Sequence, residues 1–158
     1  NISEKRMTNT LTFFLVAHIF LGTLGIIFLT AYLLSIFKKE VDLKWLKINS
    51  FLALLSFIAS WITGGYYYTS YYGKSVKPVI LKGGYSWVHS VLMETKEHVF
   101  LFLPFLTLAL FAVTYFGNLD LKKDKKLALA TAGLCFTTVS AALAIMLFGI
   151  VISGAVGK

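Results

Sequence analysis

Largely apolar stretches alternate with short polar segments along the whole chain. Each apolar stretch is at least about 20 residues long, which is the length that a helix needs to cross the hydrocarbon core of a bilayer. The pattern therefore predicts an all-α fold, a four-helix transmembrane bundle that runs up-down-up-down as a single membrane domain over residues 1–158. The predicted spans are residues 11–37, 48–68, 87–116 and 127–156.

The composition supports a membrane protein and narrows the chemistry that it can carry. Hydrophobic residues make up 58% of the chain and charged residues 14%, with a mean hydropathy of +0.78, which excludes a large soluble catalytic domain. The single cysteine, Cys135, lies in an apolar run. A disulfide within this chain, a Cys-x-x-Cys metal site and a Cys-x-x-Cys-His haem attachment are all excluded, so any cofactor is held without thioether links.

The lysines indicate how the bundle is oriented. Residues 38–47 and 118–126, which connect the first span to the second and the third to the fourth, contain eight lysines on one side of the bundle. Because cytoplasmic loops carry an excess of lysine and arginine, we expect both termini outside, in a bacterial or archaeal inner (plasma) membrane. The net charge of +8 is assigned to the membrane surface and not to nucleic acid. The first apolar run is too long for the core of a cleavable signal peptide, so we expect a retained helix.

The side opposite these lysines is rich in aromatic residues. The link of residues 69–86 contains several glycines and Pro78, and we expect it to fold over the end of the bundle. Seven aromatic side chains gather there, which we interpret as an interfacial belt, with a quinone or peptide site as the alternative. They are Tyr66, Tyr67, Tyr68, Tyr71, Tyr72, Tyr85 and Trp87.

Two histidines are the strongest candidates for chemistry, because ionisable side chains within a span are costly. His18 in the first span and His98 in the third each lie 19 residues before the lysine-rich end of their helix, at Phe37 and Gly117, so the two imidazoles are predicted at one depth. The first and third spans occupy diagonal corners of the bundle, with axes about 11 to 14 Å apart. This gap predicts one non-covalent haem b, with His18 and His98 as its metal ligands.

Small residues near the histidines would leave room for a porphyrin. Gly22 and Gly25 share a helix face with His18, at intervals of four and seven residues. Gly64 and Gly65 in the second span fall near the same depth, and all four glycines are candidates for cofactor binding. The alternative is that small residues at such intervals let membrane helices pack closely without a cofactor.

This arrangement is similar to small membrane cytochromes b, in which facing helices supply axial histidines to a haem inside a four-helix bundle. The resemblance rests on His18, His98 and the glycine stripe. It implies electron transfer between a quinol in the membrane and a partner redox protein at the tyrosine-rich side. It also implies a subunit of a larger respiratory or redox complex rather than a self-contained enzyme, and we identify no catalytic residue.

Two alternatives stay open. A non-haem metal or quinone site could be built from His89, Glu94, Glu97 and His98, with or without His18. Under the haem hypothesis Glu94 would instead accept the second ring proton of His98, and His89, nine residues away, is expected to be an interfacial histidine. The other alternative is an accessory subunit without a cofactor, which packs only against lipid and a larger membrane complex.

Overall fold

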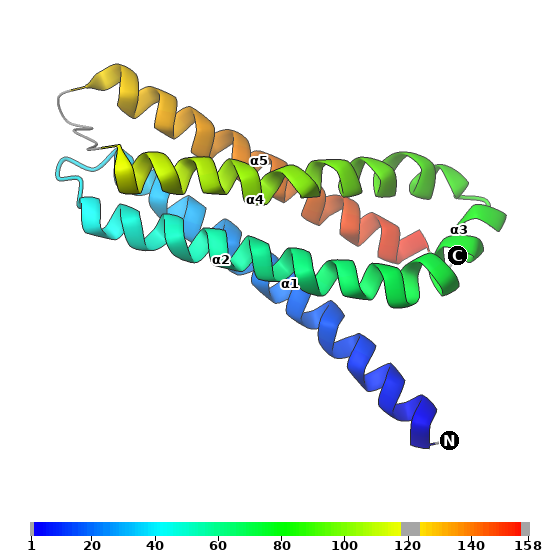
Figure 1. Cartoon of the computed structure of the whole chain (residues 1–158). Coiled ribbons are helices and arrows are strands. Elements are labelled where there is room, and N and C mark those ends of the chain that lie inside the picture. The colour runs from blue at the N-terminus through cyan, green and yellow to red at the C-terminus, as the bar shows by residue number, and fades with distance from the viewer. Residues whose placement is uncertain (1, 118–123, 156–158) are drawn as a thin grey trace.

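The computed structural model describes residues 2–117 and 124–155, with side chains from residue 7 onward. The predictions for residues 118–123 of the second lysine-rich segment and for residue 156 lie outside the described residues. Figure 1 shows four long helices and a short helix, α3, at one end. The elements are α1 (Ile2–Ile36), α2 (Leu43–Tyr67), the π-helical segment η1 (Tyr68–Val76), α3 (Lys77–Lys82), the π-helical segment η2 (Val88–Met93), α4 (Glu94–Phe116) and α5 (Lys125–Ala155).

The predicted all-α fold with four long apolar helices is confirmed. Four helical stretches are long and apolar enough to cross a membrane: Met7–Ile36, Leu43–Lys82, Val88–Phe116 and Lys125–Ala155. Two of them begin at an aspartate whose side chain accepts hydrogen bonds from the first free backbone N–H groups, as helix N-caps do. Asp42 accepts from Lys44 and Trp45, and Asp124 accepts from Lys126 and Leu127.

The link of residues 69–86, which the sequence pattern placed between the second and third spans, is mostly helical. Helix α2 continues without interruption through η1 into α3 and ends only at Gly83. Pro78 does not break this path, and it stands where the π-helical segment η1 gives way to α3. The second span is therefore longer than the sequence pattern indicated.

The helices pack as a four-cornered bundle. Helix α1 packs against α2 and α5, and α4 packs against the same two helices, so α1 and α4 occupy diagonal corners as predicted. In Figure 1 the first half of α1 diverges from the other helices toward its N-terminal end. No residue from Met7 to Leu24 is buried, in agreement with this divergence.

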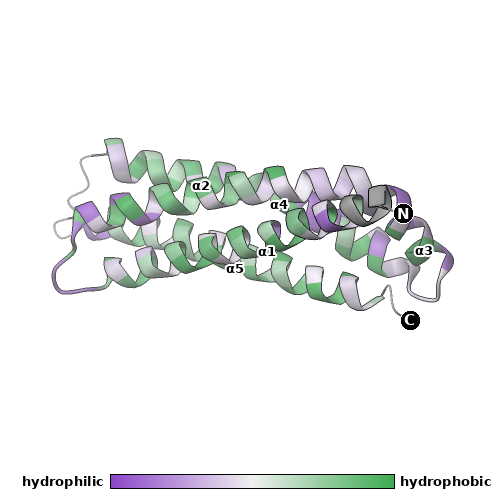
Figure 2. Ribbon diagram, turned by 90° about the horizontal axis from the view of Figure 1, so that it is seen from below, coloured by the Kyte–Doolittle hydropathy of each residue, from purple (hydrophilic) through white to green (hydrophobic). Residues whose placement is uncertain are grey.

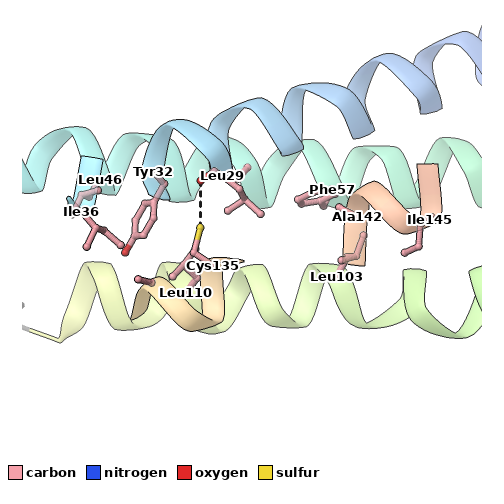
Figure 3. Packing of buried hydrophobic residues seen from close by; sticks show 12 residues of the cluster. Leu29, Tyr32, Ile36, Leu46, Phe57, Leu103, Leu110, Cys135, Ala142 and Ile145 are labelled. Carbon is pink, nitrogen blue, oxygen red and sulfur yellow. Dashed lines mark hydrogen bonds between the residues drawn. The ribbon is translucent and has the colours of Figure 1, made fainter. Parts of the chain in front are cut away.

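The well-packed core lies toward the ends of the helices that face away from α3. Figure 3 shows Leu29, Tyr32, Leu110 and Cys135 directed toward one another between α1, α4 and α5. The Cys135 thiol donates a hydrogen bond to the Leu29 carbonyl, at 3.3 Å. Thr114 donates its hydroxyl proton to the Leu110 carbonyl, so the Tyr32 hydroxyl is the donor in the buried Tyr32–Thr114 pair, at 2.7 Å. Polar groups in this core are thus paired within the bundle.

The outside of the bundle is apolar along most of its length. Figure 2 shows hydrophobic residues along the four long helices and the strongly hydrophilic ones gathered toward the two ends. Large side chains such as Phe13, Phe20, Phe102, Phe105 and Leu129 are more than half exposed. Because this surface is far more extensive than a soluble monomer exposes, it indicates contact with a lipid bilayer. Together with the four candidate spans, it indicates an integral membrane protein.

Candidate functional site at the tyrosine-rich end

A cavity of about 510 Å³ lies at the end of the bundle where α1 diverges. All four long helices and both π-helical segments contribute to its wall. The lining is mainly aromatic and aliphatic, with three ionisable side chains besides the tyrosines: His18, Lys96 and Glu97. A concave, mostly apolar site with a few polar groups is typical of small-molecule binding.

Helix α1 contributes His18, whose imidazole is held in one orientation. Its Nδ1 lies 2.8 Å from the backbone carbonyl oxygen of Ser60, and the Ser60 hydroxyl donates to the His18 carbonyl at 3.0 Å. A carbonyl oxygen can only accept a hydrogen bond, so Nδ1 carries the proton. In the neutral ring Nε2 then keeps its lone pair, and this nitrogen is free to accept a hydrogen bond or to bind a metal.

Helix α2 contributes the surface against which this imidazole packs. A Cβ atom added at Gly64 would lie 2.5 Å from Nδ1 of His18 and 2.7 Å from its Cε1. Any residue other than glycine at position 64 would therefore displace the ring. On the side of α4, the ring of Phe100 meets the imidazole edge to face, with centroids 5.4 Å apart. His18 is thus fixed by a hydrogen bond and by contacts with two helices.

Helix α4 contributes the two charged residues of the cavity. The ammonium group of Lys96 lies against α5, with Nζ 3.3 Å from the position that a Cβ would take at Gly149. Within the described residues Oε1 of Glu97 is buried without a hydrogen-bond partner, while Tyr68 makes a side-chain interaction with the same carboxylate. A buried carboxylate oxygen without a partner is unusual in proteins and marks a place for a ligand or an ordered water.

The segment η1 supplies an aromatic wall. Tyr67, Tyr68, Tyr71 and Tyr72 all line the cavity, and the rings of Tyr68 and Tyr72 are stacked with centroids 5.4 Å apart. π-Helical segments are rare and often occur at functional sites, because they change which side chains share a face. The tyrosine cluster is therefore partly a cavity wall, whereas the sequence favoured an interfacial belt. Tyr66, Tyr85 and Trp87 are exposed, as a belt requires.

His98 lies elsewhere. Its side chain is exposed, it does not line the cavity, and its Nδ1 donates to the backbone carbonyl of Glu94 at 2.6 Å. The expected partner was the Glu94 carboxylate, but the hydrogen bond is to the main chain one turn earlier. The structure does not bring His98 and His18 together across the cavity of one chain.

The four candidate glycines divide into two pairs. Gly64 and Gly65 line the cavity, but Gly22 and Gly25 do not. A Cβ at Gly25 would lie 2.9 Å from the ring of Phe57, and one at Gly22 would lie 3.3 Å from the Ser60 hydroxyl. Side chains of α2 therefore occupy the space over Gly22 and Gly25, and no open slot for a porphyrin runs along this stripe of α1.

His89, which the sequence predicts to be an interfacial histidine, is buried within the protein at the α3 end. Its exposed fraction is 2%, and Nδ1 lies 3.1 Å from the Tyr72 hydroxyl. In the part of the chain that the structure describes, Nε2 of His89 has no partner. Tyr72 itself belongs to a small buried cluster at the α3 end with Val76, Val88 and Met93. Sequence position alone could not separate a buried ring from an interfacial one here.

A ligand set for a bare metal ion is not assembled among the described residues. Within residues 7–117 and 124–155, no three His, Cys, Asp or Glu side chains lie close enough to hold a metal ion together. His89, Glu94, Glu97 and His98 therefore do not converge on one point, although they are close in sequence. Glu94 is exposed, while Glu97 turns toward the cavity.

The fold and the cavity define a class of protein, a four-helix integral membrane bundle with a ligand-sized cavity at one end. Comparison of the chain with protein-family models, with curated proteins and with solved structures found no match. The functional argument therefore depends on the chemistry of the cavity.

Proposed function

We propose that the protein is a quinone-binding subunit of membrane electron transfer. The observation that carries this proposal is the cavity itself, which presents His18, Lys96 and Glu97 within walls of Tyr, Trp and Phe side chains. A quinone is a flat ring with two polar oxygens and an apolar tail, and such a site offers hydrogen-bonding groups for the oxygens and apolar area for the rest.

The position of the cavity supports a ligand that arrives from the lipid. Helix α1 diverges from the bundle toward its N-terminal end (Figure 1), no residue from Met7 to Leu24 is buried, and Leu15 and Leu101 line the cavity. An amphipathic ring with an apolar tail could enter between helices without crossing an aqueous phase. The electrons would pass to or from a redox protein partner.

The positions of the lysines support an orientation of the bundle in the membrane. With the lysine-rich segments on the cytoplasmic side of an inner membrane, both termini and the cavity belong to the outer half of the bilayer. A partner redox protein would then dock at the outer, tyrosine-rich end. The exposed Tyr85 and Trp87 suit the headgroup layer at that end.

Quinone binding can be measured through Trp61, which lines the cavity, whereas Trp45 and Trp87 do not. Titration of the purified protein in detergent with short-chain benzoquinones and naphthoquinones is expected to quench tryptophan fluorescence saturably. A Trp61→Phe variant keeps an aromatic ring in the cavity wall, so it should still bind the quinone in a competition assay but lose most of the quenching. Quenching that never saturates, or that is the same in both proteins, would refute the proposal and leave the accessory-subunit hypothesis.

A haem b bound through His18 is the second candidate function, and the tautomer of His18 favours it. The Nδ1 proton is held by the Ser60 carbonyl, so Nε2 is the nitrogen that would bind the iron of a haem. The originally expected second ligand, His98, does not line the cavity. We therefore propose that His18 would bind the haem iron and that His98 would not be required.

The visible spectrum of the purified protein, oxidised and then reduced with dithionite, tests the haem proposal. A Soret band that is lost in His18→Ala and kept in His98→Ala would support coordination through His18 alone. Loss of a low-spin spectrum in both variants would instead restore the bis-histidine arrangement, through contacts that one chain does not make. A colourless protein rules out a resident haem.

A further inference from the structure

Two of the polar atoms at the cavity are hydrogen-bond acceptors. The first is Nε2 of His18, because the short contact of Nδ1 with the Ser60 carbonyl places the ring proton on the other nitrogen. No hydrogen bond of Nε2 occurs among the described residues, since every bond of the imidazole runs through Nδ1. The Ser60 hydroxyl cannot reverse this assignment, because it donates its own proton to the His18 carbonyl.

The second acceptor belongs to Glu97. Its Oε1 is buried and, within the described residues, has no hydrogen-bond partner. An ionised carboxylate can only accept, so this atom requires a donor from a ligand or water. Tyr68 already interacts with the carboxylate from the other wall of the cavity. A ligand hydroxyl is the simplest group that satisfies Oε1.

The hydrogen-bond donor Lys96 does not distinguish a quinone from a quinol. Lys96 is the one cationic side chain in the lining among the described residues, and its ammonium group can donate to any oxygen. A quinone carbonyl and a quinol hydroxyl both accept from such a donor. Only the hydroxyl can also donate, so the two forms differ at His18 and Glu97 and not at Lys96.

From these atoms we infer that the cavity selects the reduced, dihydroxy form of its ligand, a quinol, over the oxidised quinone. The inference rests on the proposed function. Binding of the quinone leaves Nε2 of His18 and Oε1 of Glu97 without a donor from the ligand, whereas the quinol can supply one donor to each. A site built around such unpaired acceptors rejects a ligand that lacks the matching donor.

The test compares three ligands with the same ring under anaerobic conditions: a naphthoquinone, its two-electron-reduced naphthohydroquinone, and the corresponding dimethoxynaphthalene. Binding to the intact protein in detergent is followed by Trp61 fluorescence. We expect the hydroquinone to bind tighter than the quinone by about tenfold for each hydrogen bond gained. The dimethoxy compound has no O–H donor, so it should bind as weakly as the quinone although its ring is also fully aromatic.

Variants of two neighbouring glutamates locate the selectivity. Glu97→Gln replaces an acceptor by a group that can also donate, so the ratio of hydroquinone to quinone affinity should fall by about tenfold. Glu94→Gln makes the same change at an exposed position outside the cavity and should leave the ratio unchanged.

The outcomes separate the two proposals. Equal binding of quinone and hydroquinone, or tight binding of the dimethoxy compound, would overturn the selectivity for quinol and leave quinone binding standing. Failure of all three ligands to bind would overturn the proposed function itself. Because the ligand series uses the native protein, it decides the question even if Glu97→Gln does not fold.

Discussion

A Gly64→Ala variant is expected to lose ligand affinity at the cavity by about tenfold to hundredfold, the loss that corresponds to one unsatisfied hydrogen-bonding group in a buried site. The added methyl would lie 2.5 Å from Nδ1 of His18, a distance that no side-chain adjustment of alanine can relieve. The imidazole must turn or move away. It would lose its hydrogen bond to Ser60 and no longer present Nε2 to the ligand.

A glycine outside the cavity serves as the control for this variant. Gly133→Ala adds the same methyl on α5, at a position that does not line the cavity and where nothing lies within 4 Å. This change does not touch His18, so the ring should keep its Nδ1–H tautomer, which NMR of ¹⁵N-labelled histidine reports. Affinity in Gly64→Ala equal to that in Gly133→Ala would show that the position of His18 does not control binding.

The fold could be predicted because span length is a physical requirement of the bilayer. Backbone groups in hydrocarbon must be bonded within each helix, so long apolar runs indicate helices, and short connections make neighbours antiparallel. The relative depth of the helices was also predictable by counting residues from the lysine-rich end. The contact between the rings of His18 and Phe100, two residues from the expected His98, agrees with this count.

The site was harder to predict because depth does not determine direction around a helix. His98 is not on the face of α4 that lines the cavity. The helical face that lines the cavity carries Met93 at the end of η2 and Lys96, Glu97, Phe100 and Leu101 of α4, which recur at intervals of three or four residues, as one helical face requires. This stripe is visible in the sequence, and it excludes position 98. Lys96 and Glu97, a charged pair within an apolar stripe, were the signal that would have identified the face that lines the cavity.

The glycines illustrate a second limit. A small residue in a membrane helix either leaves room for a ligand or lets a neighbouring side chain approach, and the sequence pattern is the same in both cases. Which one holds depends on what the adjacent helix presents at that level. Ser60 and Phe57 of α2 face Gly22 and Gly25, so the close-packing interpretation applies to that pair.

We expect the largest loss of stability in the bundle when Phe57, which packs against Gly25, is replaced by a small residue. Phe57 is 1% exposed and packs in the core between α1 and α2. A Phe57→Ala variant should lose about 3–5 kcal/mol of the free energy of unfolding, because it leaves a cavity that neighbouring helices cannot close. Unfolding in mixed detergent micelles by increasing fractions of dodecyl sulfate, followed by circular dichroism, measures this loss.

A double-mutant cycle then tests whether Gly25 is a packing position. Gly25→Leu alone should destabilise by about 1–3 kcal/mol, because its Cβ would lie 2.9 Å from the Phe57 ring. Combined with Phe57→Ala, the leucine can fill the space that the ring leaves, so the two losses should fall short of additivity by about 0.5–3 kcal/mol. Gly133→Leu, the same substitution in open space on α5, should cost little and add independently. Strict additivity of Gly25→Leu and Phe57→Ala would mean that the ring does not occupy the space over Gly25, and a slot for a cofactor on that face of α1 would return as an explanation for the glycine stripe.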